Sequence, residues 1–194
     1  MQNKKIILAS QSPRRKQLLE WAEISFEIKV LHTKEDYPKD ICIEEVPVHI
    51  AYEKAKIVWS SFDTTEQKNI IVIAADTVVV LENEIIGKPE NRKDAINILS
   101  KLSGKKHRVI TGVYIISKTN IISFYDITFV RFNTLTIEQI EYYIDQYKPY
   151  DKAGAYAIQE WIGVTGINSI EGDFYNVMGL PISRVVKALE VIAI

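Results

Sequence analysis

Apolar and polar residues recur along this chain with the periods of strands and helices. Apolar or alternating runs predict strands, and apolar residues spaced three and four apart predict amphipathic helices. Strands are expected at Lys5–Ala9, around the alternating residues Phe26, Ile28 and Val30, at Ile70–Leu81, and as a hairpin of Val109–Ser117 with Ile121–Phe132. Helices are expected at Pro13–Trp21, Val46–Phe62, Pro89–Ser103, Thr136–Gln146 and Pro181–Ile192. Because helices and strands interleave throughout, the pattern predicts an α/β fold with a mixed sheet.

Local signals mark the ends of several elements. Ser12 is a favourable N-cap, Pro13 suits the first helical position, and Gly104 is placed to close the third predicted helix. No glycine occurs before Gly87, which excludes the glycine-rich phosphate loops that follow an early strand. Five of the eight glycines lie in 151–181, where we expect short strands and tight turns.

The composition is that of an ordinary globular protein, with 47% hydrophobic and 25% charged residues. The formal net charge of −1 argues against a protein that coats nucleic acid. Cys42 is the only cysteine, which excludes an intramolecular disulfide and suits a reducing compartment. The longest apolar run, Ile70–Leu81, contains Asp76 and is shorter than the roughly 20 residues of a membrane helix, and the polar start is unlike a signal peptide. We therefore expect a cytoplasmic protein with no membrane partner and no stable nucleic-acid partner.

Three cations, Arg14, Arg15 and Lys16, occupy the first turn of a predicted helix. The helix dipole places partial positive charge there, so each cation is disfavoured by roughly 0.3–1 kcal/mol where screening is weak. A bound anion such as a phosphate would explain the cluster, with hydroxyls supplied by Ser10 and Ser12. A solvated basic turn explains the local sequence equally well.

Asp76 interrupts an otherwise apolar strand, so its carboxylate needs a cation, a metal or the edge of a cleft beside it. Lys54, on the apolar stripe of its helix, and Lys88, in the stiff turn between Gly87 and Pro89, are candidate partners. The structural alternatives are a strand-ending aspartate, a lysine that only reaches for solvent, and a solvated turn lysine.

Other polar residues give weaker signals. Glu35 and Asp36 lie in a polar loop that could hold Mg²⁺, although most such pairs bind no metal. Gln159 follows the small residues of DKAGAYAIQ and could read the edge of a base. The three histidines lack metal-ligand spacing, Cys42 lacks the signature of a catalytic thiol, and no nucleophile elbow occurs. Zinc hydrolysis and acyl transfer are therefore unsupported.

Seven short motifs, in order along nearly the whole chain, together resemble the Maf family of nucleoside triphosphate pyrophosphatases. They are LASQSPRR (Leu8–Arg15), AYEKAK (with Lys54), AADT (Ala74–Thr77), GKP (Gly87–Pro89), HRVITGV (His107–Val113), DKAGAYAIQ (Asp151–Gln159) and NVMGLP (Asn176–Pro181). The resemblance implies one Maf-like domain over residues 1–194, similar to the inosine triphosphate pyrophosphatase fold. In that fold an elongated mixed sheet with flanking helices forms two lobes around a nucleotide cleft. The resemblance also implies cleavage between the α- and β-phosphates of a nucleoside triphosphate, which gives a nucleoside monophosphate and pyrophosphate.

The resemblance also implies roles for individual residues. Asp76 would be the general base. Base specificity would depend on Arg15, Thr77 and Gln159, the triphosphate would be held by Ser10, Arg14, Lys54 and Lys88, and a divalent cation (Mg²⁺ or Mn²⁺) would lie near Glu35 and Asp76. The Arg–Thr–Gln combination resembles the branch that acts on dTTP and UTP, with CTP or modified pyrimidine nucleotides as further candidate substrates.

Two alternatives remain open at this point. The chain could act on 7-methyl-GTP, or it could be a nucleotide-binding regulator of cell division with little turnover. A homodimer is also implied by the resemblance, and Tyr142, Tyr143 and Tyr147 could contribute to its interface.

Overall fold

The structure is a computed structural model that describes residues 4–193. The predicted domain of 1–194 therefore extends beyond the described residues at both ends. By its internal contacts the described chain divides into two compact units. Unit 1 comprises 4–76, 111–126 and 179–193, and unit 2 comprises 77–110 and 127–178.

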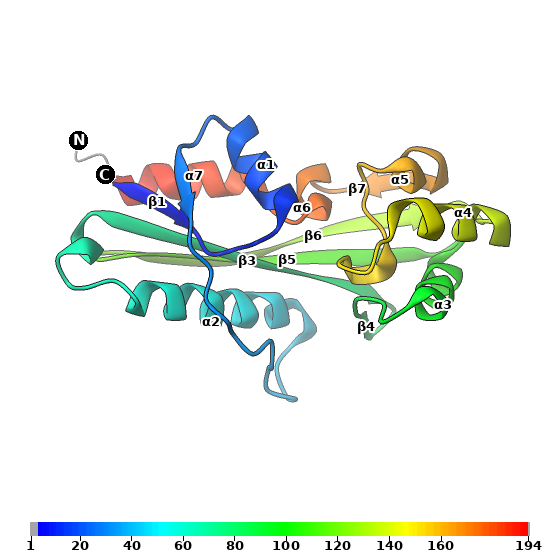
Figure 1. The fold of residues 1–194 in the computed structure, drawn as a ribbon, viewed down its shortest axis with the longest axis horizontal. Helices are drawn as coiled ribbons and strands as arrows, with labels where there is room; N and C mark the ends of the chain where they lie inside the picture. The colour runs from blue at the N-terminus through cyan, green and yellow to red at the C-terminus, as the bar shows by residue number, and fades with distance from the viewer. Residues whose placement is uncertain (1–3, 194) are drawn as a thin grey trace. The chain divides into compact units, whose positions relative to one another are not determined.

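Within residues 4–193, seven strands form one mixed sheet with flanking helices, which confirms the predicted α/β class (Figure 1). Its order is β2 (Phe26–Ile28), β1 (Lys5–Leu8), β3 (Ile70–Leu81), β5 (Lys106–Ser117), β6 (Ile121–Phe132) and β7 (Ile167–Glu171). β1 is parallel to β2 and β3, whereas β4 (Glu84–Ile86) pairs antiparallel with β3, and β7 antiparallel with β6. Three residues join the neighbours β5 and β6, a connection short enough only for antiparallel strands. The predicted hairpin is therefore confirmed.

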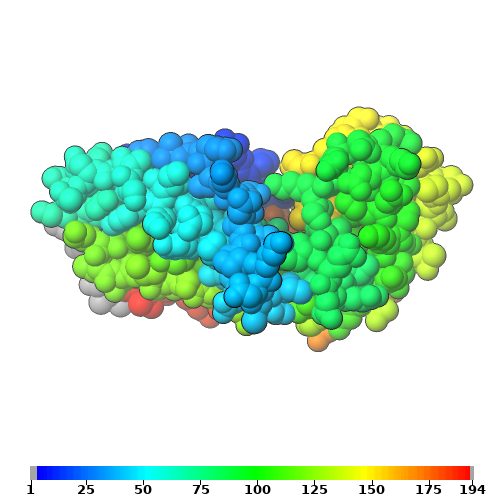
Figure 2. Space-filling view, turned by 90° about the horizontal axis from the view of Figure 1, so that it is seen from below, coloured from blue at the N-terminus to red at the C-terminus, as the bar shows by residue number. Residues whose placement is uncertain are grey.

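In unit 1, helices cover both faces of the sheet. α2 (Val46–Ser60) lies on one face, and α1 (Pro13–Trp21) and α7 (Ile182–Ala193) lie on the other (Figure 1). The α2 face is packed with small and β-branched side chains, including Ala51, Ala55, Val58, Ile7, Ile70 and Val72. The polar segment 33–45, which ends in the short helix η1 (Ile43–Glu45), lies on the surface, light blue in Figure 2. A second short helix, η2 (Glu66–Lys68), precedes β3.

Gly112 in β5 determines how closely α2 approaches the sheet. A Cβ atom here would lie 2.2 Å from the Val48 backbone nitrogen and 2.3 Å from the Pro47 carbonyl carbon. Both neighbours are backbone atoms of the first turn of α2, which cannot yield as a flexible side chain can. Only glycine therefore allows this contact, and the contact fixes the helix that carries Lys54.

In unit 2, α3 (Arg92–Leu102) packs against α4 (Ile137–Tyr147) and the short helix η3 (Ala153–Ala155). Arg92 Nε donates to Asp145 Oδ1 at 2.8 Å across the two helices. Two further short helices, α5 (Trp161–Gly166) and α6 (Phe174–Met178), flank β7 in the sequence. Among residues 4–193, none of the helices combines the length and apolar character needed to cross a membrane.

Several predicted boundaries shift in the structure. α2 ends at Ser60 rather than Phe62, and α3 begins at Arg92 because the Asn91 side chain caps it by accepting from the Asp94 nitrogen at 3.0 Å. β2 has three residues, and its last residue, Ile28, is 49% exposed, so the strand is shorter and more exposed to solvent than the predicted half-buried strand. In 151–181 the predicted tight turns form, but the prediction of several short strands is wrong. The segment contains one short strand, β7, and the short helices η3, α5 and α6.

Candidate active site

The N-terminus of α1 forms as the sequence predicts. Ser12 is the N-cap, and its Oγ accepts a hydrogen bond from the Arg15 backbone nitrogen at 3.5 Å. Pro13 occupies the first turn, and no acidic residue lies in that turn, residues 13–16. Lys16 is exposed and pairs with Glu20 at 3.6 Å, so it is the one cation of the three for which a solvated turn is the right interpretation.

Arg15 is buried, with 9% of its surface exposed, so the solvated-turn interpretation is wrong for it. Its Nη1 donates to Ser10 Oγ at 3.1 Å, and its Nε donates to the Gly179 carbonyl at 2.8 Å. Burial lowers the pKa of Arg15 from its ordinary value, while the negative charges of Asp76 and Glu35 act in the opposite direction. Arg15 is therefore a fixed cation within electrostatic reach of two carboxylates.

Lys54 joins the two carboxylates directly. Its Nζ lies 2.8 Å from Asp76 Oδ1 and 2.7 Å from Glu35 Oε1. The side chains of Lys54 and Asp76 are 17% and 14% exposed, whereas that of Glu35 is 49% exposed. The cationic partner expected for Asp76 is thus Lys54, and the alternative of a lysine that only reaches for solvent is wrong. We call Lys54, Asp76 and Glu35 the ion-pair cluster.

Unit 1 contains six of the residues predicted for the site. They are Ser10, Arg14, Arg15, Glu35, Lys54 and Asp76. Arg14 stands next to Arg15 at the start of α1, and its charge lowers the pKa of Arg15. A polyanion could take over the ammonium of Lys54 and the guanidinium of Arg14 as its partners, since both are charge-assisted donors. The carboxylates of Asp76 and Glu35, no longer paired with Lys54, could then bind water or a cation.

Unit 2 contains the other three predicted residues. Thr77 follows Asp76 in β3 and is half-buried, whereas Lys88 is exposed in the loop after β4 and Gln159 is exposed in a turn. The Gly154 backbone nitrogen donates to the Gly87 carbonyl at 3.0 Å, which ties the loop carrying Gln159 to the loop carrying Lys88. The structure therefore connects two of the predicted segments within this unit.

Glu35 and Asp76 are the predicted metal ligands. Within residues 4–193, no group of three or more histidine, cysteine, aspartate or glutamate side chains is arranged to hold a metal ion. Mg²⁺ is nevertheless often held by one or two carboxylates together with phosphate oxygens and water. Both carboxylates already share one ammonium group, so their surroundings accommodate positive charge. The pair therefore fits a divalent cation that binds together with a polyanion.

Three polar residues of unit 2, Tyr143, Lys152 and Glu160, were not singled out for the site from the sequence. Tyr143, expected at an interface together with Tyr142 and Tyr147, has 0% of its surface exposed, so that prediction is wrong for this residue. Its hydroxyl donates to Glu160 Oε2, and Glu160 is also paired with Lys152. In the sequence, the only indication of this group was the pair of charged residues Asp151 and Lys152 before a run of small residues. The local sequence did not indicate that Lys152 is buried.

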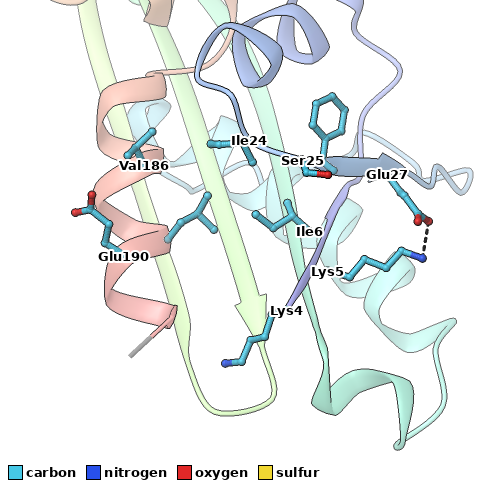
Figure 3. A pocket seen from close by; sticks show the side chains of 10 residues that line it. Lys4, Lys5, Ile6, Ile24, Ser25, Glu27, Val186 and Glu190 are labelled. Atoms are coloured by element: carbon cyan, nitrogen blue, oxygen red, sulfur yellow. Dashed lines mark ion pairs between the residues drawn. The ribbon is translucent and has the colours of Figure 1, made fainter. Parts of the chain in front are cut away.

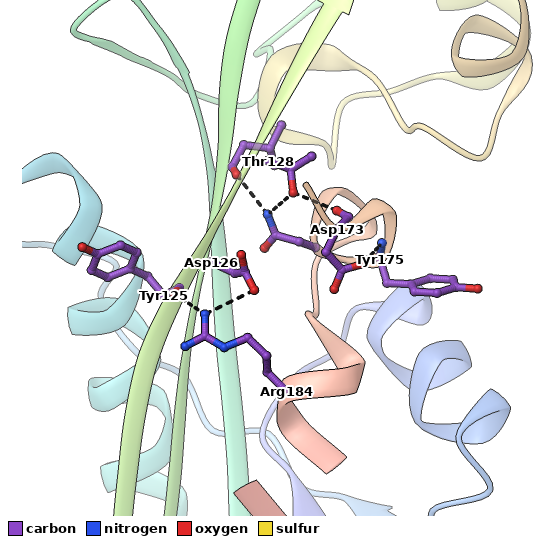
Figure 4. A network of polar contacts seen from close by, with 8 residues as sticks. Tyr125, Asp126, Thr128, Asp173, Tyr175 and Arg184 are labelled. Atoms are coloured by element: carbon purple, nitrogen blue, oxygen red, sulfur yellow. Dashed lines mark hydrogen bonds and ion pairs between the residues drawn. The ribbon is translucent and has the colours of Figure 1, made fainter. Parts of the chain in front are cut away.

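Asn176, the first residue of the NVMGLP motif, has a structural role in unit 2. Its Nδ2 donates to the Val109 carbonyl and to Thr128 Oγ1, each at 3.0 Å, and Thr128 Oγ1 donates to the Asp173 carbonyl at 2.8 Å (Figure 4). In unit 1, the same figure shows Arg184 donating to the Tyr125 carbonyl at 2.7 Å. These contacts hold β5 and β6 to the segments that follow them.

An open groove of about 580 Å³ lies in unit 1, lined by residues of β1, β2 and α7 (Figure 3). The charged residues at its rim include Lys5, which pairs with Glu27 at 2.7 Å. None of the predicted site residues is among those lining this groove. It is therefore not part of the candidate active site.

Comparisons with known proteins agree with these motifs. The sequence model of the family described as Maf-like protein matches residues 5–192. The dTTP/UTP pyrophosphatase of Cytophaga hutchinsonii is 48% identical over 190 residues, which cover 98% of this chain and 85% of the relative. That of Phocaeicola vulgatus is 48% identical over 187 residues, 96% of this chain and 95% of the relative. The dTTP/UTP pyrophosphatase of Porphyromonas gingivalis is 45% identical over 187 residues, which cover 96% of this chain and 93% of the relative.

Proposed function

Because the chain belongs to the Maf family, we propose that it hydrolyses nucleoside triphosphates to nucleoside monophosphates and pyrophosphate, with dTTP and UTP as its substrates. The ion-pair cluster of Lys54, Asp76 and Glu35, with the buried cation Arg15 within electrostatic reach, is the observation that carries this proposal. The names of the relatives, dTTP/UTP pyrophosphatase, support the choice of nucleobase.

The triphosphate would be bound by cations and hydroxyls that the fold already orients. Ser10 and Arg15 are fixed by hydrogen bonds, and Arg14 lies at the positive end of α1. Such preorganised donors stabilise charge that develops on a leaving group, because they need no further reorganisation when the reaction occurs. Lys88 is proposed as a further phosphate-binding residue. Arg15, Thr77 and Gln159 would contribute to recognition of the base.

In the proposed reaction, a water molecule attacks the α-phosphorus. A new P–O bond forms, the water proton passes to the Asp76 carboxylate, and the bond from the α-phosphorus to the bridging oxygen breaks. Pyrophosphate leaves with the electron pair of that bond. Lys54, which pairs with both Asp76 and Glu35 before substrate arrives, would bind the phosphates instead and so release the Asp76 carboxylate for the proton.

Glu35 and Asp76 would also hold the divalent cation that we propose as a cofactor, Mg²⁺ or Mn²⁺. When bound, such a cation would neutralise part of the triphosphate charge. Pairing with Lys54 would lessen the repulsion between the two carboxylates until a divalent cation binds.

The test is hydrolysis of a panel of canonical and modified nucleoside triphosphates with Mg²⁺ or Mn²⁺, in which pyrophosphate and orthophosphate are assayed separately. We expect pyrophosphate from dTTP and UTP, and the panel also ranks CTP and modified pyrimidine nucleotides. Preferential turnover of 7-methyl-GTP would assign the chain to the other substrate class. Tight nucleotide binding without turnover would favour a regulatory protein and contradict the proposal.

Gln159→Glu supplies a second test of the base preference. This change replaces an amide that can donate and accept with a group that, when ionised, can only accept. We expect it to lower kcat/KM for dTTP and UTP more than for 7-methyl-GTP. An equal effect on all three nucleotides would remove Gln159 from base recognition.

A further inference from the structure

The loop of unit 2 that carries Gln159 ends in a tight turn. The Glu160 backbone nitrogen donates to the Ala157 carbonyl at 3.1 Å, so Ile158 and Gln159 are the two central residues of the turn. Ile158 is 4% exposed, whereas Gln159 is exposed. The turn therefore buries one of its side chains and leaves the amide of the other available to a ligand.

Tyr143 of α4 holds both sides of this turn. Its hydroxyl accepts a hydrogen bond from the Ala157 nitrogen at 3.1 Å and donates to Glu160 Oε2. The other carboxylate oxygen of Glu160 lies 3.6 Å from Lys152 Nζ, and Lys152 also donates to Asp151 Oδ1 at 2.8 Å. We call Tyr143, Lys152 and Glu160 the Gln159 anchor.

Burial makes this anchor rigid. Tyr143 is 0% and Lys152 7% exposed, so water competes poorly for their polar groups. Removing one member would leave a buried polar partner unsatisfied, which costs more than the hydrogen bond itself contributes. The remaining groups would then move to find new partners, and the turn of Gln159 would move with them.

A second contact fixes the start of the loop. The Gly154 nitrogen donates to the Gly87 carbonyl, one residue before Lys88. Gly154 has φ 71°, and a Cβ atom there would lie 2.9 Å from Val79 Cγ2, so both conformation and space require glycine. With its start and its final turn both held, the loop has little freedom to change the position of Gln159.

We propose that the Gln159 anchor positions the Gln159 amide for nucleobase recognition and thereby determines how well the protein discriminates between bases. This inference rests on the proposed function. An amide distinguishes one base edge from another only if its donor and acceptor are presented in a fixed orientation, and a displacement of about 1 Å is enough to lose much of that effect. Tyr143, Lys152 and Glu160 act through Gln159, so they are positioning residues.

The test compares two variants of the anchor with a matched control. Tyr143→Phe removes one hydroxyl and keeps the ring, and Glu160→Gln removes the charge and keeps the shape. Tyr142→Phe makes the same chemical change on the same helix at a residue that is 49% exposed. Discrimination is the ratio of the Kd values for the non-hydrolysable α,β-methylene analogues of GTP and dTTP. We expect about a 10-fold fall in this ratio for each anchor variant and no change for Tyr142→Phe.

A double-variant cycle separates positioning from a general loss of stability. If the anchor acts through Gln159, adding Tyr143→Phe to Gln159→Ala changes the ratio by less than about twofold. In turnover of dTTP, Tyr143→Phe should raise KM and leave kcat nearly unchanged. Thermal unfolding is measured in parallel, and Lys152→Met takes the place of Tyr143→Phe if that variant does not fold.

The possible outcomes separate this inference from the proposed function. An unchanged ratio in both anchor variants, or an effect of Tyr143→Phe that is the same with and without Gln159, would overturn the positioning role. Because the Kd ratio needs no turnover, failure of the wild-type protein to release pyrophosphate would overturn only the proposed function. Failure of all analogues to bind would overturn both.

Discussion

Asp76 is a carboxylate on a buried strand that is stabilised by a neighbour from another element. The sequence predicted that Asp76 needs a partner, because an unpaired carboxylate in an apolar strand is costly. It also indicated Lys54 as a candidate partner, since an ammonium group on the apolar stripe of a helix must reach a polar group or solvent. The structure confirms the pair, at 2.8 Å. Local sequence could not show that Glu35 shares the same ammonium, because its loop has no periodic pattern that would place it.

The role of Asp76 can be tested by a change of one atom. We expect Asp76→Asn to lower dTTP turnover by at least about 100-fold, the usual contribution of a general base. Binding of the α,β-methylene dTTP analogue, measured without divalent cation, should be kept, because the substitution removes a negative charge near the phosphates. Asp40→Asn is the control for the same chemical change, because Asp40 is exposed in the 33–45 segment. Loss of nucleotide binding together with turnover would contradict the assignment of Asp76 as the base.

His107 gives unit 2 a sensitivity to acid. The side chain is 1% exposed, its Nε2 lies 2.7 Å from the Tyr156 hydroxyl, and burial lowers the pKa of His107 to about 4 from 6.5. The unfolded chain therefore binds more protons than the folded chain between these two pH values. The contribution of His107 to stability is present above pH 6.5 and is lost as the pH falls toward 4.

The expected size of this effect is up to about 3 kcal/mol in the free energy of unfolding. It can be measured by urea unfolding across this pH range. The double variant His107→Phe with Tyr156→Phe should show a shallower decline than the wild type, whereas His32→Gln, at an exposed site, should follow the wild type. Parallel curves for the double variant and the wild type would show that His107 does not titrate on unfolding.

Among the elements, those with a long periodic pattern were predicted well. β3, β5, β6 and α7 follow their apolar spacing. α1 was predicted instead from its Ser12 cap and Pro13, because its buried face includes the charged Arg15 and shows no apolar period. The segment 151–181 was predicted wrongly since single-turn helices are too short to show a period, and its glycines and small residues allow turns as readily as strands. The Gln159 anchor was missed for the related reason that Tyr143, Lys152 and Glu160 meet only after the loop has folded back on α4.

Gly112 allows a prediction about the placement of α2. Gly112→Ala should lower the free energy of unfolding by about 3 kcal/mol, because the new Cβ overlaps backbone atoms of α2. dTTP turnover should fall as well, since α2 carries Lys54. Gly87→Ala, where no atom lies within 4 Å of the added Cβ, serves as the control for stability. Equal stability of the two variants in urea unfolding would mean that α2 can shift without cost.

For the whole molecule, the balance of 24 basic and 25 acidic residues gives no long-range attraction for a nucleotide. Attraction would come from local cations such as Arg14, Lys54 and Lys88, and salt screens such groups where they are partly exposed. We therefore expect KM for dTTP to rise several-fold between about 0.05 and 0.5 M KCl, with kcat little changed. Steady-state kinetics over this range checks it, and a fall in kcat at constant KM would argue against phosphate binding by these residues.

The shortness of β2 also affects how molecules of this protein behave toward one another. An edge strand exposes backbone donors and acceptors that can pair with the edge of another molecule, and long, flat edges promote aggregation. β2 exposes only three residues, and its central residue, Glu27, carries a charge held by Lys5 at 2.7 Å. A second chain aligned along this edge would find few backbone groups to pair with and would have to accommodate that ion pair. The brevity that made β2 hard to predict thus makes this edge of the sheet a poor template for intermolecular pairing.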